Sequence, residues 1–586
     1  MKRAILGLLA LGACATTNDE AAAPRNGSAA LQALLDEHWA LVLSENPVFA
    51  TTLGVRDYDD RLGDPSLPAI EQGARARTDL LARLRALPDD GLAEEDRLNR
   101  DLLVLDLEGE VEEARYPARA MLLTNRGGPH LDLTGLPDRL PFRTVADYES
   151  YLARLRAAPD YLAAATQTLQ ESIETGWTQP CEPMAGFEDS INVHVVDDPA
   201  DSIFMAPFEK RPAAIPEARF GAMKSEAAEI VATAAVPALR RFEAFYNLEY
   251  QPNCREEVGI SSLPQGQEYY EHRVRMFTTT DTDAETVHRT GLAEVARIRA
   301  QMEEIAAAEG YDSLADFQTY LRTEPRFYPK SPEERIAAAS VIAKKMDGQL
   351  VKLFTRLPRM PYDIKPIPED IAEKTTTAYY SRPAGDGSRS GTYWVNLTKL
   401  DTRPLHELEA LTLHEAVPGH HLQIALAQEL DMPPFRRYGG FTAFVEGWGL
   451  YAESLGEEVG FYETPYTKFG QLSYEMWRAC RLVVDTGMHA KGWTRQQAID
   501  FMAENSGLSM NNIETEVDRY ITWPGQALAY KTGEMKMKEL RARAEAALGE
   551  DFDLRRFHDA VLADGAVPLS ILETRIAAWI EEQRAR

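Results

Sequence analysis

Cysteine is scarce in this chain of 586 residues, which contains only Cys14, Cys181, Cys254 and Cys480. Four scattered cysteines are too few for a thiolate zinc site or for the disulfide framework of a small secreted domain. An exported compartment permits a bridge between Cys181 and Cys254, but the sequence does not decide the pairing.

Basic residues are outnumbered: 63 lysines and arginines face 92 acidic residues, which gives a net charge of −29. This excess disfavours nucleic acid and anionic membrane surfaces as partners of the folded body, and we expect no nucleic-acid binding. The remaining composition, 44% hydrophobic and 26% charged, is that of a globular protein. The length exceeds one ordinary core, so either several subdomains or one large helical body is expected.

The N-terminal apolar run is too short to span a bilayer. It lies in "MKRAILGLLALGACATT", where Lys2 and Arg3 precede the apolar run and small residues follow it, as in a signal peptide. Residues 11–14, "LGAC", resemble a bacterial lipobox, in which Cys14 is lipid-modified; an ordinary signal with a chance cysteine is the alternative. We therefore expect a signal peptide at 1–13, a flexible tether at 14–28 and a catalytic body at 29–586. The protein is expected to be a lipoprotein that faces the periplasm or cell exterior, with membrane contact only through Cys14.

The body shows helical periodicity from about residue 29 onward. One apolar stripe consists of Leu292, Val295, Ile298, Met302 and Ile305. Residues 375–400 differ, because β-branched and aromatic residues surround a Gly/Ser/Asp turn, which predicts a hairpin or edge strands. The pattern predicts a mostly α-helical body with a small β-element beside the next motif.

That motif is "LHEAVPGHHLQ" at 413–423, which places three of the 11 histidines within eight residues. Zinc hydrolases usually have two histidines four residues apart on one helix, whereas Pro418 occupies that position here. In a regular helix His420 lies about 240° around the axis from His414, and His421 lies about 10 Å along it. Because Pro418 cannot donate a hydrogen bond and Gly419 accepts unusual dihedrals, we predict a local bulge that brings a second histidine to the metal.

Acidic residues complete this predicted zinc site. "FVEGWGLYAE" supplies Glu446 and, seven residues later, Glu453, which share one face of a helix. One can bind the metal while the other orients a ligand histidine. Two histidines and Glu446 leave a fourth position for water, which is typical of a catalytic zinc site. Glu415 is the expected general base for that water.

The motifs resemble those of a bacterial family known as domain of unknown function 885. They read "HEAVPGHHLQ", "EGWGLYAE", "RACRLVVDTGMHAKGW" at 478–493 and "RYITWPGQALAYKTG" at 519–533, with "DGSRSGTYWVNL" at 386–397 upstream. The likeness extends over most of the body.

That family is in turn similar to the helical zinc peptidases of the thimet oligopeptidase, angiotensin-converting enzyme and thermostable carboxypeptidase type. The resemblance implies a zincin-like (gluzincin) fold, with two helical halves around a deep channel. It also implies that His414, His420 and Glu446 bind zinc, with His421 as the alternative to His420. "SGTYWVNL" is expected to be an edge strand that pairs with the substrate backbone. Tyr530 and His489, with Tyr520 and Arg519 behind them, are the candidates for stabilising the oxyanion.

The combined prediction is a zinc metallopeptidase that acts on peptides. Two alternatives stay open: a zinc hydrolase of esters or non-peptide amides, and a lipoprotein binding module without catalysis. The intact Glu415 speaks against the second. The sequence leaves open the oligomeric state and whether chain ends or internal bonds are cut. It does not rank the arginines that could hold a terminal carboxylate, which are Arg382, Arg389, Arg478 and Arg481.

Overall fold

The computed structural model describes residues 26–372 and 376–585. The predicted signal peptide, Cys14 and most of the predicted tether lie outside the described residues. The helix α1 begins at Asn26, so the last three residues of the predicted tether are helical instead. Within the described ranges, no helix has both the length and the apolar character needed to cross a bilayer.

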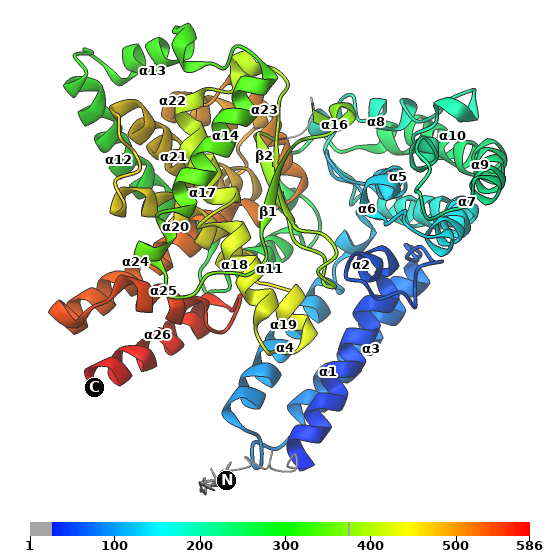
Figure 1. Cartoon of the computed structure of the whole chain (residues 1–586), viewed down its shortest axis with the longest axis horizontal. Coiled ribbons are helices and arrows are strands. Elements are labelled where there is room, and N and C mark those ends of the chain that lie inside the picture. The colour runs from blue at the N-terminus through cyan, green and yellow to red at the C-terminus, as the bar shows by residue number, and fades with distance from the viewer. Residues whose placement is uncertain (1–25, 373–375, 586) are drawn as a thin grey trace, which may run out of the picture.

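The N-terminal helices form a long antiparallel arrangement that extends from the body (Figure 1). Leucines from α1, α3 and α4 belong to the same buried cluster as the C-terminal helices, so both ends of the chain stabilise one core. The helices of this part are α1 (Asn26–Glu45), α2 (Pro47–Thr52), α3 (Leu67–Arg85) and α4 (Glu94–Glu113).

A separate lobe follows, with its own aromatic-rich core between the long α7 and the helices that cover it (Figure 1). Its helices are α5 (Pro129–Thr134), α6 (Leu136–Arg139), α7 (Val145–Thr175), α8 (Asp189–Asn192), α9 (Glu217–Ile230) and α10 (Val236–Phe245).

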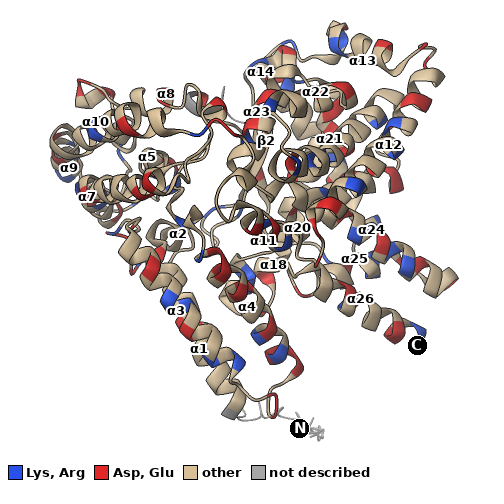
Figure 2. Ribbon diagram, turned by 180° about the vertical axis from the view of Figure 1, so that it is seen from behind, with Lys and Arg blue, Asp and Glu red and all other residues tan. Residues whose placement is uncertain are grey.

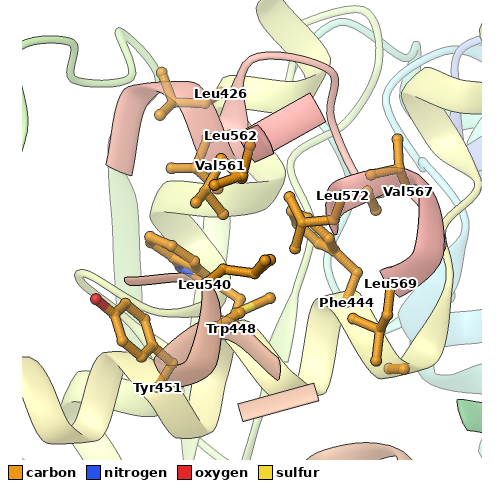
Figure 3. Packing of buried hydrophobic residues seen from close by; sticks show 14 of the residues in the cluster. Leu426, Phe444, Trp448, Tyr451, Leu540, Val561, Leu562, Val567, Leu569 and Leu572 are labelled. Atoms are coloured by element: carbon orange, nitrogen blue, oxygen red, sulfur yellow. The ribbon is translucent and has the colours of Figure 1, made fainter. Parts of the chain in front are cut away.

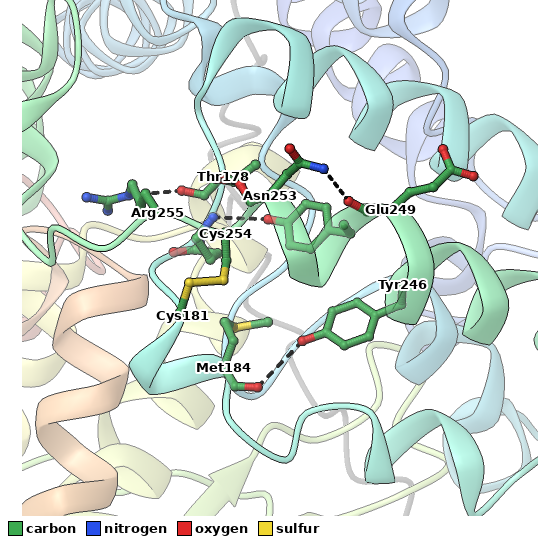
Figure 4. Close-up of a disulfide and its surroundings, with 10 residues drawn as sticks. Thr178, Cys181, Met184, Tyr246, Glu249, Asn253, Cys254 and Arg255 are labelled. Atoms are coloured by element: carbon green, nitrogen blue, oxygen red, sulfur yellow. Dashed lines mark hydrogen bonds between the residues drawn. A yellow bond between two sulfur atoms is a disulfide. The ribbon is translucent and has the colours of Figure 1, made fainter.

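A disulfide joins Cys181 and Cys254 (Figure 4). It links the segment after α7 to the segment after α10, 73 residues apart. Backbone hydrogen bonds between Arg255 and both Gln179 and Cys181 join the same two segments. Cys480 is free and buried within the body. The pairing that the sequence left open is therefore Cys181 with Cys254.

The body contains the remaining helices and is built on two large hydrophobic clusters. Its first helices are α11 (Gly266–Thr278), α12 (Ala284–Ala308), α13 (Leu314–Thr323), α14 (Pro332–Asp347), α15 (Leu350–Leu353) and α16 (Glu369–Ala372). Those around the motif are α17 (Leu408–Glu415), α18 (His420–Glu429), α19 (Pro434–Tyr438), α20 (Thr442–Glu458) and α21 (Pro465–Lys491). The last are α22 (Arg495–Asn505), α23 (Met510–Thr522), α24 (Ala529–Leu548), α25 (Leu554–Leu562) and α26 (Leu569–Arg584).

The short helix α17 lies where the two clusters meet. Leu413 packs into the cluster that α20, α24 and the C-terminal helices share, whereas Leu411 packs into the cluster around α12 and α21. Figure 3 shows part of the first cluster, in which Trp448 and Phe444 of α20 meet leucines and valines of α24 to α26. The motif is thus fixed from both sides by well-packed apolar groups, which is what a rigid site needs.

The described residues contain one sheet of three short strands, β1 (Tyr362–Pro366), β2 (Ala378–Ser381) and β3 (Gly391–Val395). Its order is β1-β3-β2, with β3 parallel to β1 and antiparallel to β2. The mostly α-helical prediction is confirmed. The position of "SGTYWVNL" was predicted wrongly, because β3 is the central strand and β2 lies at the edge.

Charged residues of both signs are interspersed along the outer helices (Figure 2). On α3, for example, Arg77 forms ion pairs with Glu45 and Glu110 at 2.5 and 2.8 Å. Ion pairs between fully exposed side chains contribute little stability individually, and these partly buried ones contribute somewhat more. Acidic and basic side chains thus alternate along most of these helices, although α4 begins with the acidic residues Glu94, Glu95 and Asp96.

Candidate metal centre

The first histidine lies at the end of a helix that stops early. α17 ends at Glu415, and Ala416 to Gly419 connect it to α18, which begins at His420. The Val417–Pro418 peptide bond is cis. The prediction of a bulge within one continuous helix is wrong, because one helix ends at Glu415 and a second begins at His420. Pro418 has no N–H for a helical hydrogen bond, and the Gly419 N–H donates instead to the Leu413 carbonyl at 2.9 Å.

Glycine is required at position 419 by a close approach of the backbone. A Cβ atom there would lie 1.9 Å from the carbonyl oxygen of His414, a distance that no real contact shows. The connection is held from the other side by Trp448, whose indole N–H donates to the Pro418 carbonyl at 2.9 Å. These contacts hold the connection between α17 and α18 in a defined conformation, which sets the direction of α18.

The helix α20 supplies the acidic residues and passes close to His414. A Cβ atom at Gly449 would lie 2.7 Å from the His414 ring, so only glycine lets the imidazole lie against α20. Glu446 and Glu453 lie on the same side of this helix and approach opposite ring nitrogens of His414. The Glu453 carboxylate bonds Nδ1 at 2.8 Å, which leaves Nε2 free to face Glu446.

Three donor atoms converge at the end of this arrangement. Glu446 Oε2 lies 3.6 Å from His414 Nε2 and 3.4 Å from His420 Nε2, and all three atoms lie within 4.8 Å of one another. Donor atoms about 2.1 Å from a tetrahedral zinc ion are ~3.4 Å apart, so the observed spacing fits such an ion. Glu446 Oε2 is also buried without a hydrogen-bond partner among the described residues. The structure thus brings together His414, His420 and Glu446, the set named from the sequence.

His421 points away from this cluster. Its Nδ1 atom lies 2.9 Å from the Tyr380 hydroxyl and its Nε2 atom 3.0 Å from the Met360 carbonyl. Burial lowers the pKa of His421 to about 4, so the ring is neutral at pH 7. Both nitrogens are engaged in holding the sheet region against α18, and His421 does not join the three donor atoms.

The electrostatics of the cluster favour a cation. Burial alone lowers the pKa of His414, but the Glu446 and Glu453 side chains outweigh it and raise the pKa to about 9. Burial likewise opposes ionisation of Glu446, yet His414 and His420 hold the pKa of that carboxyl well below its usual range. Burial raises the pKa of Glu415, and the positive charge of the two histidines opposes this rise. Buried carboxylates of this kind need positive charge nearby, which a bound metal supplies.

A cavity of about 430 Å³ opens beside the cluster. His414, Glu415, His420 and Glu446 line one side of it. The segment 376–380, which includes most of β2, lines another side, so the edge strand beside the cluster is β2 and not β3. The remaining wall comes from α21, α23, Tyr530 and residues 124–126, which lie next to the lobe.

Tyr530 lies at the cluster as predicted. Its ring stacks against that of His414 with centroids 6.4 Å apart, and it lines the cavity. Its hydroxyl oxygen accepts a hydrogen bond from Arg519 Nη2 at 3.3 Å, so its own O–H is available to donate. Tyr520 lies behind, where its hydroxyl accepts from Trp477 Nε1 at 2.9 Å and from Arg481 Nε at 2.8 Å.

The prediction for His489 needs correction, because this residue does not line the cavity. It is fully buried, its Nδ1 atom accepts from the Ile260 N–H at 3.1 Å, and its Nε2 atom lies 3.0 Å from the Tyr520 carbonyl. Burial lowers the pKa of His489 to about 3, so it is neutral and cannot serve as a cationic group. Its role is to connect α21, α23 and the segment before α11.

Two charged residues at the cavity were missed from the sequence: Arg126, which lines it, and Glu516, which lies behind its wall. Glu516 is fully buried and pairs with Arg126, Arg481 and Arg519. Glu516 and Arg519 are three residues apart on α23, which places them on one face of the helix. This spacing could have predicted an ion pair between them. Arg126 comes from a loop almost 400 residues upstream of Glu516, and no sequence pattern links the two.

The chain is similar to two solved structures and matches one protein family. Among solved structures, it is similar to a "putative lipoprotein" from Colwellia psychrerythraea, with 28% identity, a TM-score of 0.90, and coverage of 95% of this chain and 99% of that one. It also resembles a "putative lipoprotein of unknown function" from Shewanella oneidensis, with 18% identity, a TM-score of 0.69, and coverage of 94% and 100%. No curated protein matches it. The model of a family described as bacterial protein of unknown function (DUF885) matches residues 47–576, and the chain therefore belongs to this family.

Proposed function

We propose that the protein is a zinc-dependent peptidase. The observation that carries this proposal is the convergence of His414 Nε2, His420 Nε2 and Glu446 Oε2 at separations of 3.4 to 3.6 Å to the carboxylate oxygen. Two imidazoles and one carboxylate are the ligand set of many catalytic zinc sites. A zinc ion held there supplies a Lewis acid that polarises a carbonyl group and lowers the pKa of water.

Glu415 is the proposed proton acceptor. It follows His414 directly, lines the same cavity, and is buried enough to exclude most bulk water. Its carboxylate takes a proton from the attacking water and passes it to the leaving amine, as a general base and then a general acid. Tyr530, with its hydroxyl oriented by Arg519, donates a hydrogen bond to the oxygen that becomes negative during attack.

The β-edge supports a peptide as the substrate. Among the described residues β2 pairs only with β3, so its other edge leaves backbone N–H and C=O groups for a further strand. Because Thr376 to Tyr380 line the cavity, an extended peptide can add to β2 with its backbone beside the cluster. An ester or a small amide does not need such an edge, so this feature favours peptides over the alternative substrates.

We further propose export and a lipid anchor at Cys14. Each of the two similar structures is described as a "putative lipoprotein". The Cys181–Cys254 disulfide fits an oxidising compartment, because such bridges are rare in the cytosol. The peptides met outside the cytoplasmic membrane are then the substrates, and the anchor is the only membrane contact.

The proposal is tested by metal analysis of the purified protein and by hydrolysis of a peptide mixture with and without a chelator. We expect one zinc ion per chain and activity that is lost with the chelator and restored by zinc. Glu415→Gln should keep the zinc and lower kcat about 10²- to 10⁴-fold, since a positioned general base contributes that much. Glu429→Gln is the matched control, because Glu429 is the last residue of α18 and pairs with exposed Arg359. Activity that survives the chelator, or that Glu415→Gln leaves unchanged, refutes the proposed function.

A further inference from the structure

The cavity beside the metal cluster is rich in arginine. Arg126, Arg478, Arg481 and Arg519 line it, and we call these four residues the arginine group. Three of them share a single carboxylate: Glu516 lies 2.9 Å from Arg481, 3.2 Å from Arg126 and 3.4 Å from Arg519. One negative charge against three guanidinium groups leaves an excess of positive charge on this side of the cavity, opposite Glu415 and Glu446, which favours an anionic ligand there.

Arg481 has a buried donor without a partner. Its Nε atom donates to the Tyr520 hydroxyl and its Nη2 atom to Glu516, but Nη1 is buried and has no hydrogen-bond partner among the described residues. The side chain is only 2% exposed. Arg478 shows the same feature at Nε, and its Nη2 atom reaches Glu453 only at 3.6 Å. Buried N–H groups are almost always paired, so unpaired ones beside a cavity indicate the place of a missing acceptor.

The arginine group lies close to the reaction site. The Arg481 guanidinium carbon is 4.2 Å from the centre of the Tyr530 ring, and that ring is 6.4 Å from the His414 ring. An extended chain advances ~3.4 Å per residue, so a group held by Arg481 lies within about three residues of a bond held at the cluster. The C-terminal carboxylate is the anion that every peptide carries within this distance of a bond near its end, whereas acidic side chains occur there only in some sequences.

The other arginines considered from the sequence do not reach this cavity. Arg382 donates to the Tyr438 carbonyl at 2.5 Å, and Arg389 lines a different cavity near the lobe. Of the four arginines that the sequence offered for binding a terminal carboxylate, Arg478 and Arg481 line this cavity.

We propose that the arginine group binds the free C-terminal carboxylate of the substrate, so that cleavage is confined to the last few residues of a peptide. This inference rests on the proposed peptidase function and adds the substrate class. Arg481 Nη1 and Arg478 Nε offer the unpaired donors, and a guanidinium binds a carboxylate more tightly and with better defined geometry than an amide.

The test uses the full zinc-loaded protein and two equimolar libraries of N-acetylated hexapeptides that differ only in a free or an amidated C-terminus. We expect kcat/KM for the free acids to exceed that for the amides about 10- to 100-fold, since hydrogen bonds between charged groups are worth that factor. In Arg481→Gln the ratio should fall towards one, and Arg481→Lys should restore it in part. Arg389→Gln, which changes an arginine outside this cavity, should keep the wild-type ratio.

A binding measurement separates failure of this inference from failure of the proposed function. Zinc-loaded Glu415→Gln is titrated calorimetrically with both libraries, and free acids should bind at least about tenfold more tightly. Equal affinity for acids and amides overturns the inference, whether or not Arg481 variants fold. Equal hydrolysis of both libraries by the wild type overturns it too, while the peptidase function stands. Tighter binding of acids by Glu415→Gln, combined with no hydrolysis of either library by the wild type, supports the carboxylate site and refutes the peptidase.

Discussion

Replacement of Glu453 should weaken metal binding although this residue does not touch the proposed ion. The fully buried carboxylate accepts from His414 Nδ1 at 2.8 Å and lies 3.6 Å from Arg478. It therefore fixes which nitrogen of His414 carries the proton and which faces Glu446. Glu453→Ala removes that acceptor and leaves a buried N–H unpaired, whereas Glu453→Gln keeps an oxygen in place but removes the charge.

The size of the effect follows from this geometry. Loss of a carboxylate that orients a ligand histidine costs about 10- to 100-fold in metal affinity, equivalent to ~1.4–2.7 kcal/mol. We expect Glu453→Ala to lie near the upper end, because the His414 ring is freed from its acceptor. Glu453→Gln should lie near the lower end, because the amide oxygen can still accept from Nδ1.

The assay is competition for zinc between the protein and a chelator of known affinity, which requires no substrate. Glu457→Gln is the matched control, since Glu457 lies on the same helix, is exposed, and pairs with Lys468. Thermal unfolding of the metal-free proteins separates lost affinity from lost fold. Zinc affinity of folded Glu453→Ala within twofold of the wild type refutes the assignment of Glu453 as the residue that orients His414.

Three further predictions concern stability. Lys531→Met should lower the free energy of unfolding by ~3–5 kcal/mol in urea titrations, because buried Lys531 contacts three glutamates at 2.8 to 3.0 Å. Replacing Cys181 and Cys254 together by serine should cost ~4 kcal/mol in the same measurement, given the separation of 73 residues. Burial raises the pKa of Asp485 to about 7, above its unfolded value, so this carboxyl destabilises the protein as pH rises from about 4 to about 7. Asp485→Asn should therefore gain stability relative to the wild type over that range, and a constant difference in unfolding free energy contradicts this.

The fold class was predictable from local patterns, but the burial of individual residues was not. The apolar stripe on α12 was read correctly at Val295, Ile298 and Met302, which are buried, whereas Leu292 is 43% exposed. A periodic pattern identifies the face of a helix but not how far the neighbouring helices cover it. For the same reason the strands at 375–400 were found and their order was not: β1, at Tyr362–Pro366, pairs with β3 and makes it central.

The three residues of the candidate metal cluster could be named from the sequence because they lie in two short motifs with chemical constraints. The form of the connection was not, since Pro418 and Gly419 allow either a bulge or a break, and contacts from α20 decide between them. Trp448 holds the Pro418 carbonyl, and Gly449 admits the His414 ring. Both residues belong to the second motif, so the two motifs depend on each other: one supplies the ligands, and the other the space and the hydrogen bond that position them.

The anion-binding side of the cavity depends on contacts between distant segments. The three-residue spacing of Arg478 and Arg481 already indicates that they share one face of α21. The sequence does not indicate that these two arginines line the cavity whereas Arg382 and Arg389 do not, because this depends on which segments pack around each residue. Glu516 satisfies part of each neighbouring guanidinium and holds it in place, so that Arg481 presents one nitrogen that is both ordered and unpaired. Under the proposed function, a cavity with positive charge on one side and the His414, His420 and Glu446 cluster on the other selects substrates by two features at once. In that proposal the distance between the two sides, and not either motif alone, determines which peptide bond is cut.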